Sequence, residues 1–305
     1  MLLAAENLYL GGDKLINKGL TLLDLEWANV QAGQAWAKSQ AGTDDDAAQL
    51  CIAYTEAGQY VLPLRQHPRA QITWLMASLA AARRLKKRNS EGDALGNLGN
   101  TYADLGETNR AIEFFEQALL IVREIGDRRG EGTALGMLGL AYVDLGKTRQ
   151  AIEFYEKQLA IAHEIGYRNG EGTALVNLGG SYLKLGETRR AIEFLEQALP
   201  IQREIGSLRG EGVVLGNLGA AYADLGETKR AIQLHKHSLV IARKIGDRRR
   251  EGQALANMSL ELYKLGERAK ARTLAEQAIP ILEEIEDPNQ AILREQLRLW
   301  CEETG

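Results

Sequence analysis

The sequence is poor in several residue types whose abundance would mark other classes of protein. Its 305 residues include only two cysteines, five prolines and four histidines, and aromatic residues make up 6% of the chain. Cys51 and Cys301 lie far apart and have no metal-ligand spacing, so we expect no metal site. Thiols outside disulfides are typical of a reducing compartment, which predicts a cytoplasmic protein.

Neither one sign of charge nor a long apolar run dominates the chain. The net charge of −4 and the pI near 5.8 do not provide the basic face that nucleic-acid binding usually needs. No apolar run approaches the roughly 20 residues that span a bilayer. The first ten residues, MLLAAENLYL, have no basic leader and are interrupted by Glu6, which argues against a signal peptide. We therefore expect neither a nucleic-acid nor a membrane partner.

The chain does contain an internal repeat of 40 residues. The first copy reads EGDALGNLGNTYADLGETNRAIEFFEQALLIVREIGDRRG, and related copies begin at residues 91, 131, 171, 211 and 251. Together these five copies fill residues 91–290. Self-similarity at a fixed period of this length is typical of a solenoid, in which every repeat packs on its neighbours.

Each copy is predicted to form two amphipathic helices joined by a glycine turn. Apolar residues of the first copy recur at helical spacing in two stretches, which are Leu95, Leu98, Tyr102 and Leu105, then Ile112, Phe115, Leu119 and Val122. Gly106 separates the two stretches and Gly126 follows the second, since glycine adopts the left-handed conformation at little cost. Such a helix pair cannot bury its apolar stripe alone, so neighbouring pairs must stack.

Two further glycine patterns need an interpretation. Gly96 and Gly99 recur as Gly136 and Gly139, and because each costs about 1 kcal/mol in a helix they indicate a close helix approach. Gly146-Lys147-Thr148 resembles the end of a phosphate-binding loop, but Ala141 stands where that loop needs its first glycine. The other copies have a glycine turn at this place, so we predict a turn and no nucleotide.

The repeat resembles the tetratricopeptide repeat. The residues that carry the resemblance in the first copy are Leu98, Gly99, Tyr102, Gly106, Ala111, Phe115 and Ala118. The 40-residue form is similar to Leu-Gly-Asn repeat adaptors and to kinesin light chains. This resemblance implies an all-α, right-handed superhelical solenoid of antiparallel helix pairs. In the fifth copy Met258, Ser259 and Leu262 replace the motif, as is expected near an end.

The flanking residues are predicted to be helical as well. We expect N-terminal linker or capping helices in 1–50, a divergent capping repeat in 51–90 and a C-terminal capping helix in 291–305. Ile292, Leu297 and Trp300 would cover the last repeat. Glu26, Asn29, Ala32 and Trp36 stand at spacings similar to those in the linker helices of STAND-type signalling ATPases. That resemblance implies a sensor arm whose nucleotide site lies upstream.

The resemblance also implies where a ligand would bind. In tetratricopeptide arrays the first helices line a concave groove, and residues next to the Leu-Gly pair contact the ligand. The corresponding residues here are Asn97, Asn100, Asp104, Met137, Asp144, Asn177, Lys184, Asn217, Asp224 and Asn257. An amide has donors and acceptors that suit a peptide backbone. The alternative is that the asparagines reflect duplication and are simply solvated.

Other polar residues give weaker indications. His235 and His237 point about 200° apart on a helix and cannot bind one metal, so we interpret each as satisfied or exposed. A group of arginines falls in the predicted loops between copies, where it pairs with the glutamates Glu131, Glu171, Glu211 and Glu251 or is solvated. These arginines are Arg128, Arg129, Arg168, Arg209, Arg248 and Arg249. No nucleophile–base or carboxylate pair recurs, and we expect neither an enzyme nor a cofactor.

The sequence therefore predicts a non-catalytic scaffold that binds a protein or peptide in the groove. Two alternatives remain open. The chain is a ligand-sensing regulatory arm of a STAND ATPase, or it is a structural spacer that self-associates through its repeat edges.

Overall fold

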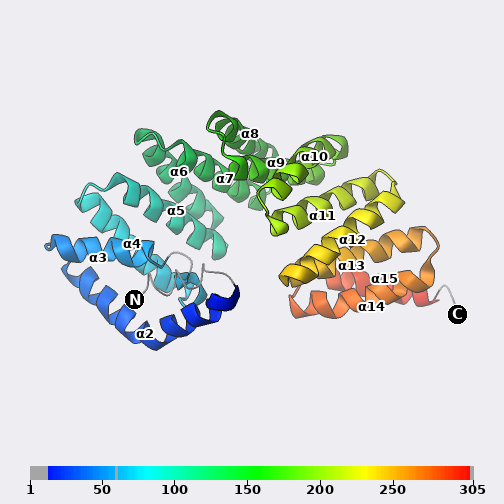
Figure 1. Cartoon of the computed structure of the whole chain (residues 1–305), viewed down its shortest axis with the longest axis horizontal. Helices are drawn as coiled ribbons and strands as arrows, with labels where there is room; N and C mark the ends of the chain where they lie inside the picture. The colour runs from blue at the N-terminus through cyan, green and yellow to red at the C-terminus, as the bar shows by residue number, and fades with distance from the viewer. Residues whose placement is uncertain (1–12, 59–60, 303–305) are drawn as a thin grey trace. The chain divides into compact units, whose positions relative to one another are not determined.

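A computed structural model describes residues 13–58 and 61–302, and nearly all of these residues are helical. The chain forms two compact units, Met1–Lys147 and Thr148–Gly305 (Figure 1). The first unit contains α2 (Asp13–Gln40), α3 (Asp45–Glu56), the short 3-10 helix η1 (Leu62–Leu64), α4 (Pro68–Arg84), α5 (Arg88–Asp104), α6 (Thr108–Glu124) and α7 (Arg128–Asp144). The second contains α8 (Thr148–Glu164), α9 (Arg168–Lys184), α10 (Thr188–Glu204), α11 (Leu208–Asp224), α12 (Thr228–Ile245), α13 (Arg248–Lys264), α14 (Arg268–Glu284) and α15 (Asn289–Glu302).

The helices from α5 to α14 follow the sequence repeat. First helices begin at residues 88, 128, 168, 208 and 248, and second helices at 108, 148, 188, 228 and 268. The glycine between the two helices of a copy is left-handed, as at Gly106, where φ is +74°. The N–H of Glu107 then donates to the carbonyl of Tyr102 at 2.9 Å, which satisfies a carbonyl of the last helical turn. The predicted all-α solenoid is confirmed.

The segment Gly146-Lys147-Thr148 is a turn, as predicted. Gly146 has φ +73° and follows the end of α7, and Thr148 begins α8. The Lys147 ammonium lies 5.7 Å from the centre of the Tyr142 ring. This turn connects two helices, whereas a phosphate-binding loop connects a strand to a helix.

The prediction that the arginines lie in loops between copies is wrong, because each loop ends earlier than predicted. The arginines placed in those loops instead lie in the first turn of the next first helix, since α7, α9 and α13 begin at Arg128, Arg168 and Arg248. The reason is a helix cap in a segment that reads as polar and glycine-rich. Asp127 Oδ1 accepts a hydrogen bond from the N–H of Gly130 at 2.9 Å, which starts α7 directly after Gly126.

Close helix approach is confirmed at Gly99 and is wrong at Gly96. A Cβ added to Gly99 would lie 2.4 Å from the Phe115 ring. The helices α5 and α6 therefore approach each other closely at this glycine, in the buried interface of the copy. A Cβ on Gly96 would meet nothing within 4 Å. The same contact recurs between Gly179 and Leu195 in α9 and α10. The glycine therefore makes room for the partner residue of its own repeat.

The C-terminal helix packs on the last repeat through two of the three predicted residues, Leu297 and Trp300, and through Leu293 in place of Ile292. Leu293 and Trp300 are buried there, Leu297 packs beside them, and the Trp300 ring stacks on Tyr263 at 4.3 Å. Ile292 is 62% exposed, against the prediction that it would cover the repeat. Leu293, Leu297 and Trp300 follow a spacing of four and three, and Ile292 lies one residue, about 100°, off that stripe.

The predicted divisions at 50, 90 and 290 stay predictions. The helix α4 occupies the place of a second helix, because it begins 40 residues before α6. The preceding helix α3 ends at Glu56, so this pair departs from the shape of the later copies. The predicted absence of a signal peptide concerns residues 1–12, which lie outside the described residues.

Candidate peptide-binding face

The candidate site lies on the first helices of the repeats, a surface that we call the first-helix face. In the first unit it is formed by α5 and α7, which contact each other. In the second unit α11 contacts both α9 and α13, so three first helices lie side by side. These contacts bring residues at equivalent positions of successive copies close together within each unit.

The residues before each Leu-Gly pair are partly open to solvent. Asn97 and Met137 are half-buried in the first unit, and so are Asn177, Asn217 and Asn257 in the second. We call the four asparagines the asparagine row. Within the described parts of the chain, none of their side chains donates or accepts a hydrogen bond. The amide of Asn217 lies beside α9, since its Nδ2 would be 3.7 Å from a Cβ added to Gly180.

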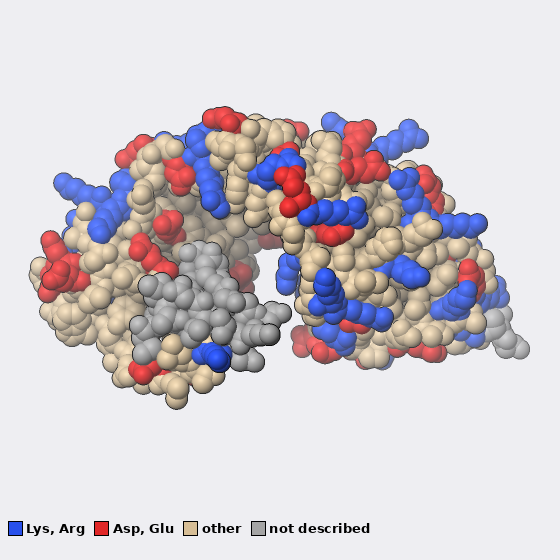
Figure 2. Space-filling model, viewed as in Figure 1, with Lys and Arg blue, Asp and Glu red and all other residues tan. Residues whose placement is uncertain are grey.

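The other predicted site residues are exposed and carry mixed charges. These residues are Asn100, Asp104, Asp144, Lys184 and Asp224. Lys264, the equivalent of Lys184 in the fifth copy, pairs with the buried Glu261 at 2.5 Å. Figure 2 shows basic and acidic side chains interspersed over the visible face, with no large patch of one sign. The charge pattern therefore does not select a strongly charged partner.

Sequence reasoning missed several residues of the first-helix face. Gln253 and Leu260 lie four residues before and three residues after Asn257, and together with Ile292 and Gln296 of α15 they line a cavity of about 130 Å³. Leu140, three residues after Met137, is 44% exposed. The spacings −4 and +3 from the asparagine row could have identified the residues on the first helices. Ile292 and Gln296 could not be identified in this way, because their place beside this face depends on how α15 packs on the last repeat.

Asp93 is a further missed residue of this face, four positions before Asn97. Reduced hydration of its carboxylate, together with the nearby carboxylates of Glu56 and Asp127, raises the pKa of Asp93 above its usual value. A negative charge at this position is therefore less favourable than at an isolated surface aspartate.

The predicted pairing of arginines with glutamates is confirmed for three copies. Arg128 pairs with Glu131, Arg168 with Glu171 at 2.6 Å and Arg248 with Glu251 at 2.8 Å. In the fourth copy Leu208 replaces the arginine that begins the helix, and Glu211 accepts a hydrogen bond from Arg203 at 2.7 Å. These arginines and glutamates join consecutive helices, so their side chains are already paired with each other in the folded chain.

The interpretation of His235 as satisfied or exposed is wrong. His235 is 1% exposed, and neither ring nitrogen has a hydrogen-bond partner among the described residues. It occupies the position of Phe115 and Leu195 and packs against Gly219, so it fills a core site. Burial lowers the pKa of His235 to about 4, although the carboxylate of Glu261 acts in the opposite direction.

The residues that resemble a STAND linker all lie on α2. Asn29 Nδ2 donates to Glu26 Oε2 at 2.7 Å, and the Trp36 side chain is 53% exposed. The tryptophan that packs in this region is Trp27, which stacks on Trp74 at 6.1 Å. Trp36 therefore lies on the exposed side of α2, opposite to the expectation of a buried tryptophan.

None of the helices in 13–58 and 61–302 is both long and apolar enough to cross a membrane. In the same ranges, no three His, Cys, Asp or Glu side chains come together as a metal site would require. The cytoplasmic location stays a prediction.

Repeated helix pairs with an open face of polar side chains define a helical-repeat protein of the solenoid class. The family model for the tetratricopeptide repeat matches residues 90–164, 131–204 and 211–284, which together cover more than half of the chain. The chain therefore belongs to the tetratricopeptide repeat family, as its sequence motif indicated. No curated protein matches it.

Solved structures of similar fold have low sequence identity. BtubC (BKLC) from P. vanneervenii has a TM-score of 0.63 and 22% identity, over 72% of this chain and 93% of that one. A putative kinesin light chain from Podosopora anserina with nearly identical TPR-like repeats has a TM-score of 0.52 and 21% identity, over 64% and 95%. A STAND protein with a tetratricopeptide repeat sensor from Pyrococcus horikoshii has a TM-score of 0.66 and 18% identity, over 97% of this chain and 45% of that one.

Proposed function

We propose that this protein is a non-catalytic scaffold that binds a protein or peptide segment along its first-helix face. The observation that carries the proposal is the asparagine row, whose half-exposed amides have no hydrogen-bond partner among the described residues. Amides in neighbouring copies offer a repeated donor and acceptor to the backbone of a bound segment. Membership of the tetratricopeptide repeat family supports this use of the surface.

The ligand would lie across several first helices, with each copy supplying one or two contacts. In the second unit Asn177, Asn217 and Asn257 stand on three helices that lie side by side. Exposed Asp224 and Lys184 border this row with opposite charges, which would fix the direction of a segment with complementary charges. The apolar Leu260 and Ile292 offer a place for one apolar side chain at the end of the row.

The test is to replace Asn177 and Asn217 together by alanine. We expect the doubly substituted chain to retain at least tenfold less of its partner than the unchanged chain in affinity capture from a lysate of the source cell, with the captured proteins identified by mass spectrometry. Circular dichroism should show unchanged helicity. A matched control is Gln197→Ala with His237→Ala, two exposed residues on the second helices α10 and α12. Equal capture by the asparagine variant and the unchanged chain would reject the proposal.

A sensor arm of a STAND ATPase is a second candidate function, favoured by the exposed Trp36 on α2. The similarity over 97% of this chain to a STAND protein with a tetratricopeptide repeat sensor supports it as well. In that case the first-helix face would bind the sensed ligand, and the exposed side of α2 would meet the ATPase core. An upstream open reading frame that encodes such an ATPase core would support this candidate. An upstream frame of unrelated sequence would reject it.

A further inference from the structure

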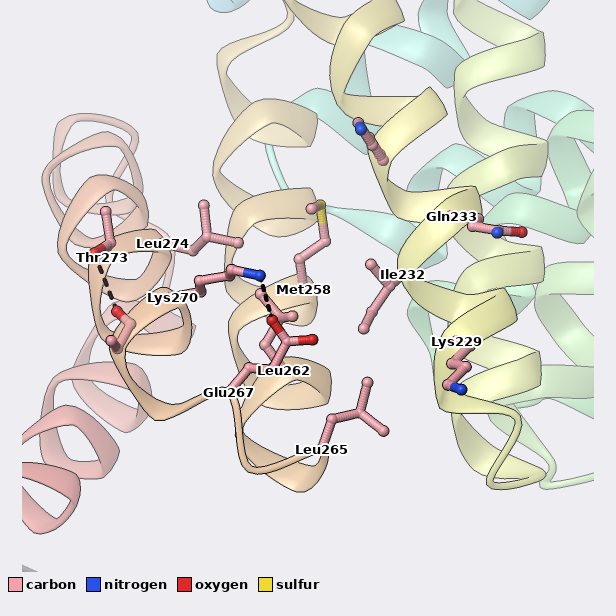
Figure 3. A pocket seen from close by; sticks show the side chains of 12 residues that line it. Lys229, Ile232, Gln233, Met258, Leu262, Leu265, Glu267, Lys270, Thr273 and Leu274 are labelled. Atoms are coloured by element: carbon pink, nitrogen blue, oxygen red, sulfur yellow. Dashed lines mark hydrogen bonds and ion pairs between the residues drawn. The ribbon is translucent and has the colours of Figure 1, made fainter.

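A second cavity lies away from the first-helix face, between the second helices α12 and α14 (Figure 3). Its volume is about 750 Å³, within the range of roughly 300–1,000 Å³ that small-molecule sites occupy. Ile232, Met258 and Leu262 form apolar walls, with Leu274 opposite. Lys229 and Lys236 lie at the rim. None of the residues proposed to bind a peptide lines this cavity.

The preceding copy fills the equivalent space with its own aromatic ring. The hydroxyl of Tyr222 on α11 donates to Glu196 Oε1 of α10 at 2.8 Å. The guanidinium of Arg230 on α12 lies over the Tyr222 ring, 3.7 Å from its centre, and pairs with the same Glu196. Tyr222 thus fills the space between α10 and α12. Its ring lies beneath the Arg230 guanidinium, and its hydroxyl donates to the Glu196 carboxylate.

The third copy of the repeat places a tyrosine in the same way. Tyr182 lies beneath Arg190, 4.6 Å from the ring centre, and stacks on Phe194 at 5.3 Å. Two copies of the second unit therefore fill this space with an aromatic ring beneath an arginine.

One repeat period later, all three of these residues are replaced. Leu262 stands 40 residues after Tyr222, where the ring would be. Lys236 stands 40 residues after Glu196, so the acceptor of the tyrosine hydroxyl has become a cation. Lys270 replaces Arg230 and pairs with Glu267 at 2.6 Å, away from any ring. The cavity includes the place that the Tyr222 ring fills one period earlier, and Lys236 has a positive charge where Glu196 has a negative one.

The charge of the rim is not neutralised within the protein. Neither Lys229 nor Lys236 forms an ion pair with any described residue, and both are exposed. They lie seven residues apart on α12, on one side of the helix, so both ammonium groups can reach a ligand at the mouth of the cavity. An aromatic group would occupy the apolar walls, and an anion would compensate the two lysines.

We propose that this cavity binds a small aromatic carboxylate, with its ring on Leu262 and Met258 and its carboxylate between Lys229 and Lys236. The ring would take the place that Tyr222 occupies one copy earlier. The carboxylate would supply the negative charge that Glu196 provides there. The apolar walls and the two lysines without ion pairs favour a free small molecule with a ring and an acid group, and about 750 Å³ lies within the range of small-molecule sites.

The test uses biphenyl-4-carboxylate as the probe and biphenyl-4-carboxamide as its uncharged counterpart, each titrated calorimetrically into the full chain. We expect the carboxylate to bind at least tenfold more tightly than the amide. Lys236→Glu should weaken carboxylate binding at least tenfold. The control Lys244→Glu changes the charge of the same helix outside the cavity and should leave the affinity within twofold.

A second variant restores the tyrosine and the glutamate that stand 40 residues earlier, Tyr222 and Glu196. Leu262→Tyr combined with Lys236→Glu should fill the space, abolish binding of both probes and keep the helicity unchanged by circular dichroism. Equal affinity for the two probes, undiminished binding to this filled variant, an equal effect of Lys244→Glu or the absence of carboxylate binding to the unchanged chain would each overturn the proposal. Capture of a partner by the first-helix face does not depend on these results.

Discussion

At the scale of single residues, His235 shows how an ionisable group can occupy a core position of the repeat. Its ring takes the place of Phe115 and Leu195 against a glycine of the facing helix. The fold favours the neutral form, because a buried imidazolium would lose its hydration without a paired hydrogen bond. The pKa of about 4 expresses this cost.

The stability of the fold should therefore fall in mild acid. The pKa of His235 is lower in the folded chain than the ordinary value near 6.5, so between these values the unfolded chain binds a proton that the folded chain does not. At pH 7 the imidazole is neutral in both states, and His235 does not lower the free energy of unfolding. As the pH falls from about 6.5 toward 4, that free energy decreases by roughly 2–3 kcal/mol. His235→Leu should remove this loss in urea unfolding measured at pH 7 and pH 4.5.

The exposed His237 on the same helix provides the control. His237→Gln should keep the same acid sensitivity as the unchanged chain, since an exposed imidazole is solvated in both states. If His235→Leu and the unchanged chain lost equal stability between the two pH values, His235 would not be the buried group described here.

At the scale of helices, consecutive repeats are joined by glutamates in the first turn of each first helix. Glu251 accepts hydrogen bonds from Arg243 at the end of α12 at 2.9 Å and from Arg248 of its own helix at 2.8 Å. Arg248 also donates to Glu284 of α14 at 2.8 Å. Glu251 thus joins α12 to α13, and Arg248 extends the network to α14. Burial alone would raise the pKa of Glu251, but the hydrogen bonds from the two arginines lower it overall.

Removing the charge of Glu251 should weaken this junction. Glu251→Gln keeps the size of the side chain but leaves Arg243 and Arg248 without their shared carboxylate, and we expect a decrease of about 1–2 kcal/mol in the free energy of unfolding. Urea unfolding at pH 7 measures it. Glu276→Gln, at an exposed position on α14, should change the value by less than about 0.5 kcal/mol. Equal values for both variants would show that the junction contributes nothing.

The sequence was sufficient to predict the helix pairs, because a repeated apolar stripe and a repeated glycine turn give the same answer five times. It was not sufficient for the helix starts. Arg128 and Gly130 read as loop, but the cap provided by Asp127 places them in α7. Ile292 and Leu293 are equally apolar, and only the way in which α15 docks decides that Leu293 is buried.

At the scale of the whole molecule, the chain offers two different kinds of surface. The first-helix face carries the asparagine row, and its residues could be proposed from the family resemblance and from the spacing −4 and +3 along a helix. The cavity between α12 and α14 could not, because it depends on what Tyr222 fills in three dimensions one copy earlier. The replacement of Tyr222 by Leu262 is visible in the sequence, but its consequence is visible only in the packing.

The central claim is that partners bind on the first-helix face, and site-specific photocrosslinking tests it whatever the identity of the partner. A benzophenone amino acid would replace either Asp224 on the first helix α11 or Gln197 on the second helix α10, both exposed positions. After irradiation in a lysate of the source cell, we predict a discrete crosslinked protein from position 224 and none from position 197. Crosslinks from position 197 alone, or the same products from both positions, would contradict the claim.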